Sequence, residues 1–109
     1  MKLNIAEENE NFIVIELDGR MDADGVAMVD ESLTAHASDK NAIIDMCRVE
    51  YMASLGIRKL LQLAKAAKLN GKKIVIANPQ RLVMGVLELA NIDKIVAVVP
   101  TLDDAKRFL

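Results

Sequence analysis

Residues 42–77 read AIIDMCRVEYMASLGIRKLLQLAKAAKLNGKKIVIA and contain two short apolar runs on either side of a longer amphipathic segment. The runs at 42–46 and 73–77 are typical of strands that are covered on both faces of a sheet. Residues 55–69 place apolar side chains at helical spacing, and Gly71 suits the end of that helix. A strand, a helix and a second strand in this order predict a right-handed crossover between parallel strands.

The same reasoning extends to both sides of this unit. Residues 12–18 are rich in β-branched side chains and predict a strand that ends at Gly19. Residues 2–7 could pair with it as an edge strand, and residues 95–99 form a further apolar run like those at 42–46 and 73–77. Helices are expected at residues 24–37 with Asp22 or Asp24 as N-cap, at 80–91 after Pro79, and from Thr101 to Leu109.

The predicted order of elements is β-β-α-β-α-β-α-β-α, which favours one α/β domain over residues 1–109. We expect a mostly parallel central sheet of about five strands with an antiparallel edge, and about four helices. No repeat, low-complexity tract or linker divides the chain.

Composition excludes several classes of protein. Cys47 is the only cysteine and His36 the only histidine, so neither an internal disulfide nor a structural zinc site can form. Aromatic residues make up 3% and the net charge is −2, which argues against direct binding of nucleic acid. No apolar run approaches the roughly 18 residues of a membrane-spanning helix. With early acidic residues and a free thiol, the sequence predicts a cytoplasmic location without membrane insertion.

Nothing in the sequence indicates an enzyme. The five glycines are isolated, so there is no phosphate-binding loop, and no catalytic residue, metal ligand set or cofactor is expected. We interpret His36 as a surface residue at a helix end and Cys47 as a small core residue. Asp45 and Glu50 are interpreted as polar groups at the end of a strand.

Charge is unevenly distributed, with 12 acidic and 4 basic residues in the first 50, and 7 basic and no acidic residues in 51–87. Such a dipolar surface can steer a partner, although chance clustering on solvated faces explains it as well. On helix 55–69, the bases Arg58, Lys59, Lys65 and Lys68 form either a solvated face or a docking surface for an acidic partner. Helix 80–91 is apolar nearly all round and is either buried or, through Met84 and its neighbours, an exposed protein-binding patch.

The most informative segment is residues 49–57, which follow a parallel strand and open a helix. Binding sites on α/β sheets favour this end of the strands. Ser54 is suited to be the N-cap of the helix, a structural role that would explain a serine here by itself.

This segment resembles the signature of STAS domains, and in particular of bacterial anti-sigma-factor antagonists, with residues 51–56 in the register of the family's loop. The resemblance extends in the right order through four further segments: residues 17–23, 71–77, 87–92 and 101–105. The sequence departs from the family pattern at Ala53, where Asp is usual, and at Leu55, where Ser or Thr is usual.

The resemblance implies a protein that takes part in partner switching. Its implied partners are an anti-sigma factor that is also a serine kinase, and a metal-dependent serine phosphatase that resets the system. It implies that Ser54 is the phosphoacceptor and that the partner-binding residues are Asp22, Met52, Ala53, Ser54, Leu55, Gly56 and Arg58. We expect a monomer or weak dimer.

Two other functions stay open from the sequence. STAS domains without phosphorylation also occur as subunits that dock to the ATPase of a membrane transporter. A small enzyme or nucleotide-binding protein that uses residues 51–56 is the third possibility.

Overall fold

The computed structural model describes residues 1–109 and contains one five-stranded sheet in the order β1-β2-β3-β4-β5. β1 (Lys2–Glu8) pairs antiparallel with β2 (Phe12–Met21). β2, β3 (Asn41–Met52), β4 (Ile74–Ala77) and β5 (Ala97–Val99) pair in parallel. The predicted mostly parallel sheet with an antiparallel edge is therefore confirmed.

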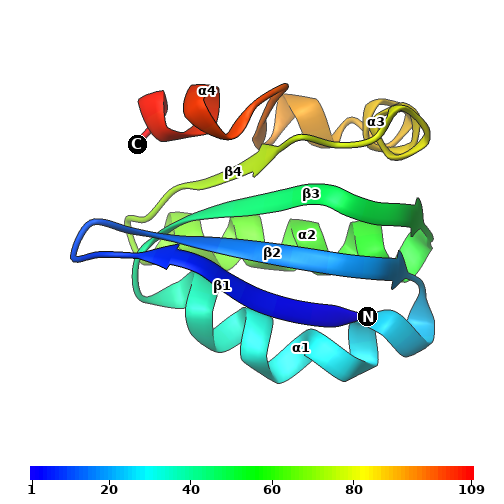
Figure 1. Ribbon diagram of the computed structural model, residues 1–109, viewed down its shortest axis with the longest axis horizontal. Helices are drawn as coiled ribbons and strands as arrows, with labels where there is room; N and C mark the ends of the chain where they lie inside the picture. The colour runs from blue at the N-terminus through cyan, green and yellow to red at the C-terminus, as the bar shows by residue number, and fades with distance from the viewer.

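Four helices and one short 3-10 helix connect the strands. They are α1 (Ala23–Ser38), α2 (Ser54–Leu69), α3 (Arg81–Leu89), η1 (Ile92–Lys94) and α4 (Leu102–Arg107). Figure 1 shows α1 below β1 and β2, with α3 and α4 above β4. None of these helices has the length and apolarity needed to cross a lipid bilayer.

Alternation along the strands divides the core between the two faces of the sheet. Ile44 of β3 faces the larger core cluster, together with Leu33 of α1 and Leu60 of α2. Val75 of β4 faces the opposite side, in a smaller cluster with Ala105 of α4. Because successive strand side chains point to opposite faces, a run in which every residue is buried requires cover on both sides.

β3 is longer than predicted, because it continues past residue 46 as far as Met52. The extension pairs with the last residues of β2, where Arg20 is opposite Tyr51 and Met21 is opposite Met52. Residues 49–57 were expected to follow the strand and open the helix, with residues 51–56 in the register of the family's loop. Only Ala53 separates the strand from α2.

β5 is shorter than predicted. Residues 95–99 were expected to form a strand covered on both faces, but the strand begins at Ala97, and Ile95 follows η1 with 60% of its surface exposed. β5 pairs only with β4, so it is an edge strand and Ala97 and Val98 are half-buried.

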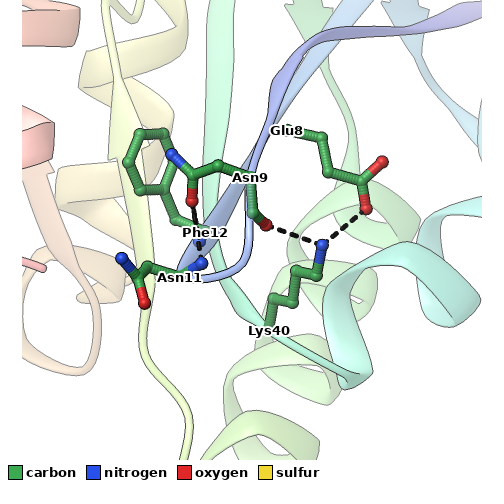
Figure 2. Close-up of polar contacts among 5 residues, drawn as sticks. All are labelled: Glu8, Asn9, Asn11, Phe12 and Lys40. Carbon is green, nitrogen blue, oxygen red and sulfur yellow. Dashed lines mark hydrogen bonds and ion pairs between the residues drawn. The ribbon is translucent and has the colours of Figure 1, made fainter.

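The turn between β1 and β2 is stabilised by side-chain contacts, drawn in Figure 2. The side-chain oxygen of Asn9 accepts hydrogen bonds from the backbone N–H groups of Asn11 at 2.8 Å and Phe12 at 2.9 Å. Lys40 donates to the Asn9 carbonyl at 2.7 Å and to Glu8 at 2.9 Å. These contacts attach the antiparallel hairpin to the start of β3.

The prediction that Cys47 is a core residue is wrong, because its side chain is exposed. By alternation it points to the same face as Ile43, but the six-residue α4 packs against Ile43 and Val75 and leaves Cys47 only partly covered. The neighbouring Asp45 is buried and accepts a hydrogen bond from the Cys47 backbone N–H at 3.0 Å.

Candidate functional site

Ser54 is the first residue of α2 and lies at the carboxyl end of β3. The N-cap residue is Ala53, whose backbone is extended (φ −106°, ψ 175°), and no side chain caps this helix. The prediction that Ser54 is the N-cap is therefore wrong by one position. Its side chain is exposed and makes no hydrogen bond with the rest of the protein.

Backbone contacts fix the position of Ser54 relative to the sheet. The Ala53 N–H donates to the carbonyl of Met21 at 3.1 Å, which joins the start of α2 to the end of β2. Gly56 allows this close approach. A Cβ at that position would lie 2.7 Å from the Met21 carbonyl oxygen and 2.5 Å from the sulfur of Met52. Gly56 and Met52 are themselves buried, so they support the site from beneath.

Asp22 lies at the neighbouring strand end and is the N-cap of α1. Its carboxylate accepts a hydrogen bond from the Gly25 N–H at 2.9 Å and lies 3.4 Å from Nε of Arg20. The Gly25 hydrogen bond, followed by the contact with Arg20, holds the pKa of Asp22 below its usual value. Asp22 was one of two predicted N-caps, and the structure selects it over Asp24.

Arg20 connects Asp22 to Tyr51 on the next strand. Its guanidinium carbon lies 4.2 Å from the centre of the Tyr51 ring, which is the geometry of a cation–π contact. The two residues are opposite each other in the β2–β3 register. Neither Arg20 nor Tyr51 was among the predicted site residues, because only strand pairing brings them together.

A shallow apolar groove of about 530 Å³ begins beside Ser54 and ends at α3. Its lining includes Tyr51, Met52, Ser54, Ile57, Val86 and Leu89. Leu89 is 87% exposed, and Leu82 at the other end of α3 is 78% exposed. The interpretation that α3 is buried is therefore wrong for part of the helix. Val83 and Leu87 are buried and Val86 packs partly against the core, but Leu82 and Leu89 are open to solvent.

Two further predicted site residues, Leu55 and Arg58, are exposed. Leu55 lies on the first turn of α2, next to Ser54, and Arg58 lies one turn further along the helix. The strand ends and the first turns of α1 and α2 thus form one surface with a free hydroxyl, a paired carboxylate, an arginine and exposed apolar groups. Such a surface has the mixed composition of a protein-binding site.

One cluster of potential metal ligands lies elsewhere. The ligand atoms of Glu16, Asp45 and Cys47 lie within 4.8 Å of one another. Partial burial of the sulfur, together with the carboxylates of Asp45 and Glu16, raises the pKa of the Cys47 thiol. Since a metal needs the thiolate, this environment works against coordination by Cys47.

Comparison with known proteins identifies relatives of this chain. Residues 5–105 match the STAS domain family. An anti-sigma-factor antagonist (STAS) domain protein from Planctomyces limnophilus has a similar structure, with a TM-score of 0.81, 19% identity, and coverage of 94% of this chain and 93% of that one. A candidate anti-sigma factor antagonist from Thermotoga maritima gives a TM-score of 0.77 at 16% identity, covering 97% and 91% of the two chains.

The unphosphorylated form of the anti-sigma factor antagonist SpoIIAA is also similar. Its TM-score is 0.64 at 17% identity, with coverage of 85% of this chain and 96% of SpoIIAA. At these identities the structural likeness supports the fold. The match to the family spans nearly the whole chain, and it agrees with the resemblance found in the residues around Ser54. The protein belongs to the STAS domain family.

Proposed function

We propose that this protein is an anti-sigma-factor antagonist that binds an anti-sigma factor with serine kinase activity and is released when Ser54 is phosphorylated. The main supporting observation is the exposed, unbonded hydroxyl of Ser54 at the edge of an apolar groove. The Planctomyces limnophilus protein and SpoIIAA add support, because both are anti-sigma-factor antagonists.

The proposed contact surface surrounds Ser54. Leu55 and Arg58 lie on the same helix, and Asp22 lies at the adjoining strand end. An apolar side chain of the partner would occupy the groove between Tyr51 and Leu89. Met52, Ala53 and Gly56 contribute mainly by holding the backbone in place.

Phosphorylation would act on the partner rather than on the fold. A phosphate adds about −1.5 to −2 charges and lies at the N-terminus of α2, where the helix dipole is favourable by roughly 0.3–1 kcal/mol. Arg58 lies one turn further along and can also attract it. The cost arises when a docked partner buries this charge without a matching group, at about 2–5 kcal/mol. The affinity would then fall about 30-fold to several-thousand-fold.

The unusual neighbours of Ser54 bear on the choice of kinase. Ala53 removes the negative charge that is common before the serine, and Leu55 places an exposed apolar side chain after it. We propose that the matching kinase recognises an apolar residue next to the acceptor serine.

The rest of the cycle follows from this assignment. A metal-dependent serine phosphatase would restore the free hydroxyl, and the protein would act in the cytoplasm as a monomer or weak dimer without catalysing a reaction itself. The alternative is a STAS subunit that docks to a transporter ATPase without phosphorylation, which Ala53 in place of Asp favours.

The decisive experiment is phosphorylation by a candidate anti-sigma kinase from the same organism in the presence of ATP, followed by intact-mass measurement. One phosphate should appear on the wild-type chain and on the control Ser32→Ala, because Ser32 is an exposed serine far along α1. None should appear on Ser54→Ala. A stable complex with the kinase but no phosphate on Ser54 would contradict the proposed regulation, and co-purification with a transporter ATPase would favour the alternative.

A further inference from the structure

A second, larger groove of about 1060 Å³ lies toward the other end of α2. It is formed by the C-terminal half of α2, the turn that leads into β4, the residues between η1 and β5, and the chain end. At 1.5 Å per residue along the helix, Lys68 lies about 20 Å from Ser54. The two grooves share no lining residue, and they come nearest to each other on α2, where Ile57 lines the first and Leu61 lines the second.

The rim of this groove is positively charged. Five lysines line it: Lys65, Lys68, Lys72, Lys73 and Lys94. All five are exposed, none forms an ion pair, and no acidic residue lines the groove. Their only side-chain hydrogen bond is from Lys73 to the carbonyl of Phe108, at 3.4 Å. The chain thus concentrates positive charge at a place where its own carboxylates do not neutralise it.

The floor of the groove is apolar. Ile95 is 60% exposed and Phe108 is 51% exposed, and Leu61 of α2 lies beside them. An apolar centre with a charged rim is the usual layout of a protein-binding surface. Exposed large apolar side chains gathered in a groove also point to a binding role.

We propose that this basic groove binds an acidic, amphipathic segment of a partner protein, with carboxylates over the five lysines and an apolar side chain against Ile95 and Phe108. Charge complementarity argues for the acidic character of the segment. The concave shape argues against a flat bilayer, whose surface would not reach the floor. With one aromatic residue and no arginine in its lining, the groove is poorly suited to single-stranded nucleic acid.

The test uses a short synthetic peptide of Asp and Glu interrupted by two Leu, titrated into ¹⁵N-labelled protein. Backbone shifts should map to α2 beyond Leu61 and to Ile95, and binding should weaken as salt rises. Lys65→Gln combined with Lys68→Gln should lower the affinity about two- to thirtyfold, as expected for two rim contacts. The matched control, Lys2→Gln with Arg81→Gln, changes the net charge equally at two unpaired bases elsewhere and should bind like the wild type.

Ile95→Ser and a peptide with Ser in place of Leu should each weaken binding, which tests the apolar floor separately. Ser54→Asp should leave peptide binding unchanged, so this proposal can fail or hold independently of the function proposed for Ser54. Equal affinity of the Lys65/Lys68 variant and the control would overturn the proposal. Tighter binding to anionic vesicles or to an oligonucleotide would overturn it too, as would self-association that disappears in the Lys65/Lys68 variant.

Discussion

Nζ of Lys59 lies 2.7 Å from a carboxylate oxygen of Asp30, and the lysine is only 4% exposed. The ammonium group also donates to Thr34 of α1 and to Gln62 of α2, the latter at 3.2 Å. Lys59 therefore links the two helices that cover one face of the sheet. The prediction that Lys59 lies on a solvated or partner-docking face of α2 is therefore wrong.

Substitution of Asp30 and substitution of Lys59 should change the free energy of unfolding by different amounts. Asp30→Ala leaves the buried ammonium without its counter-charge and should lower the free energy of unfolding by about 1–3 kcal/mol. Lys59→Met removes the charge and keeps most of the volume, so stability should stay within about 1 kcal/mol of the wild type. Glu31→Ala, at an exposed acid that makes no ion pair, is the control. Urea unfolding of the three variants measures this, and equal losses for Asp30→Ala and Glu31→Ala would contradict it.

Ser54→Asp should keep the circular dichroism spectrum and unfolding midpoint of the wild type but bind the anti-sigma factor much more weakly. The helix N-terminus tolerates the new charge, whereas a docked partner would bury it. Ser32→Asp places the same charge on α1 and should bind normally. Calorimetric titration of each variant with the anti-sigma factor is the measurement, and equal affinity for both would count against the role of Ser54.

Gly56→Ala and Gly85→Ala should change stability in opposite directions. A Cβ at Gly56 meets the carbonyl oxygen of Met21 and the sulfur of Met52 at less than 3 Å, so overpacking should cost about 1–3 kcal/mol. A Cβ at Gly85 of α3 has nothing within 4 Å, and the helix should gain about 0.5–1 kcal/mol. Thermal and urea unfolding compare the two, and a stabilised Gly56→Ala would refute the close packing at the start of α2.

The lowered pKa of Asp22 predicts that the stability of the protein depends on pH in the acidic range. Its pKa is lowered in the folded state by the Gly25 hydrogen bond and by Arg20, so the ionised carboxylate stabilises the fold above the unfolded pKa of about 3.9. This stabilisation is lost as pH falls below that value and through the folded pKa. Asp22→Asn keeps an acceptor for the Gly25 N–H but removes the charge. As pH falls from about 5 to about 2, the free energy of unfolding of the wild type should therefore decrease relative to that of the Asp22→Asn variant.

The variant Asp22→Ala separates the two contributions. Because this substitution removes both the charge and the acceptor, the Asp22→Ala variant should be less stable than the Asp22→Asn variant at every pH. Urea unfolding at a series of pH values gives the comparison. A difference between wild type and Asp22→Asn that does not change with pH would show that the charge of Asp22 plays no part.

Local patterns in the sequence were sufficient for most of the fold. Apolar runs such as 42–46, the helical spacing in 55–69 and the capping candidates Asp22 and Asp24 predicted the order of elements and the parallel sheet. The motif around Ser54, together with four further segments in the right order along the chain, indicated the family, which the match over residues 5–105 confirms. These features depend on residues close in the chain, whose periodicity determines which face of an element is apolar.

The tertiary structure alone decided which surfaces are covered and which distant residues meet. Cys47 is exposed because α4 is too short to cover it, and Leu82 and Leu89 are exposed because α3 packs against the core through the side of the helix that carries Val83, Val86 and Leu87. Arg20 meets Tyr51 through strand register, and Lys59 meets Asp30 through the packing of α1 against α2. A sequence pattern specifies an apolar or polar face, but burial and pairing depend on the element that packs against that face, often from far along the chain.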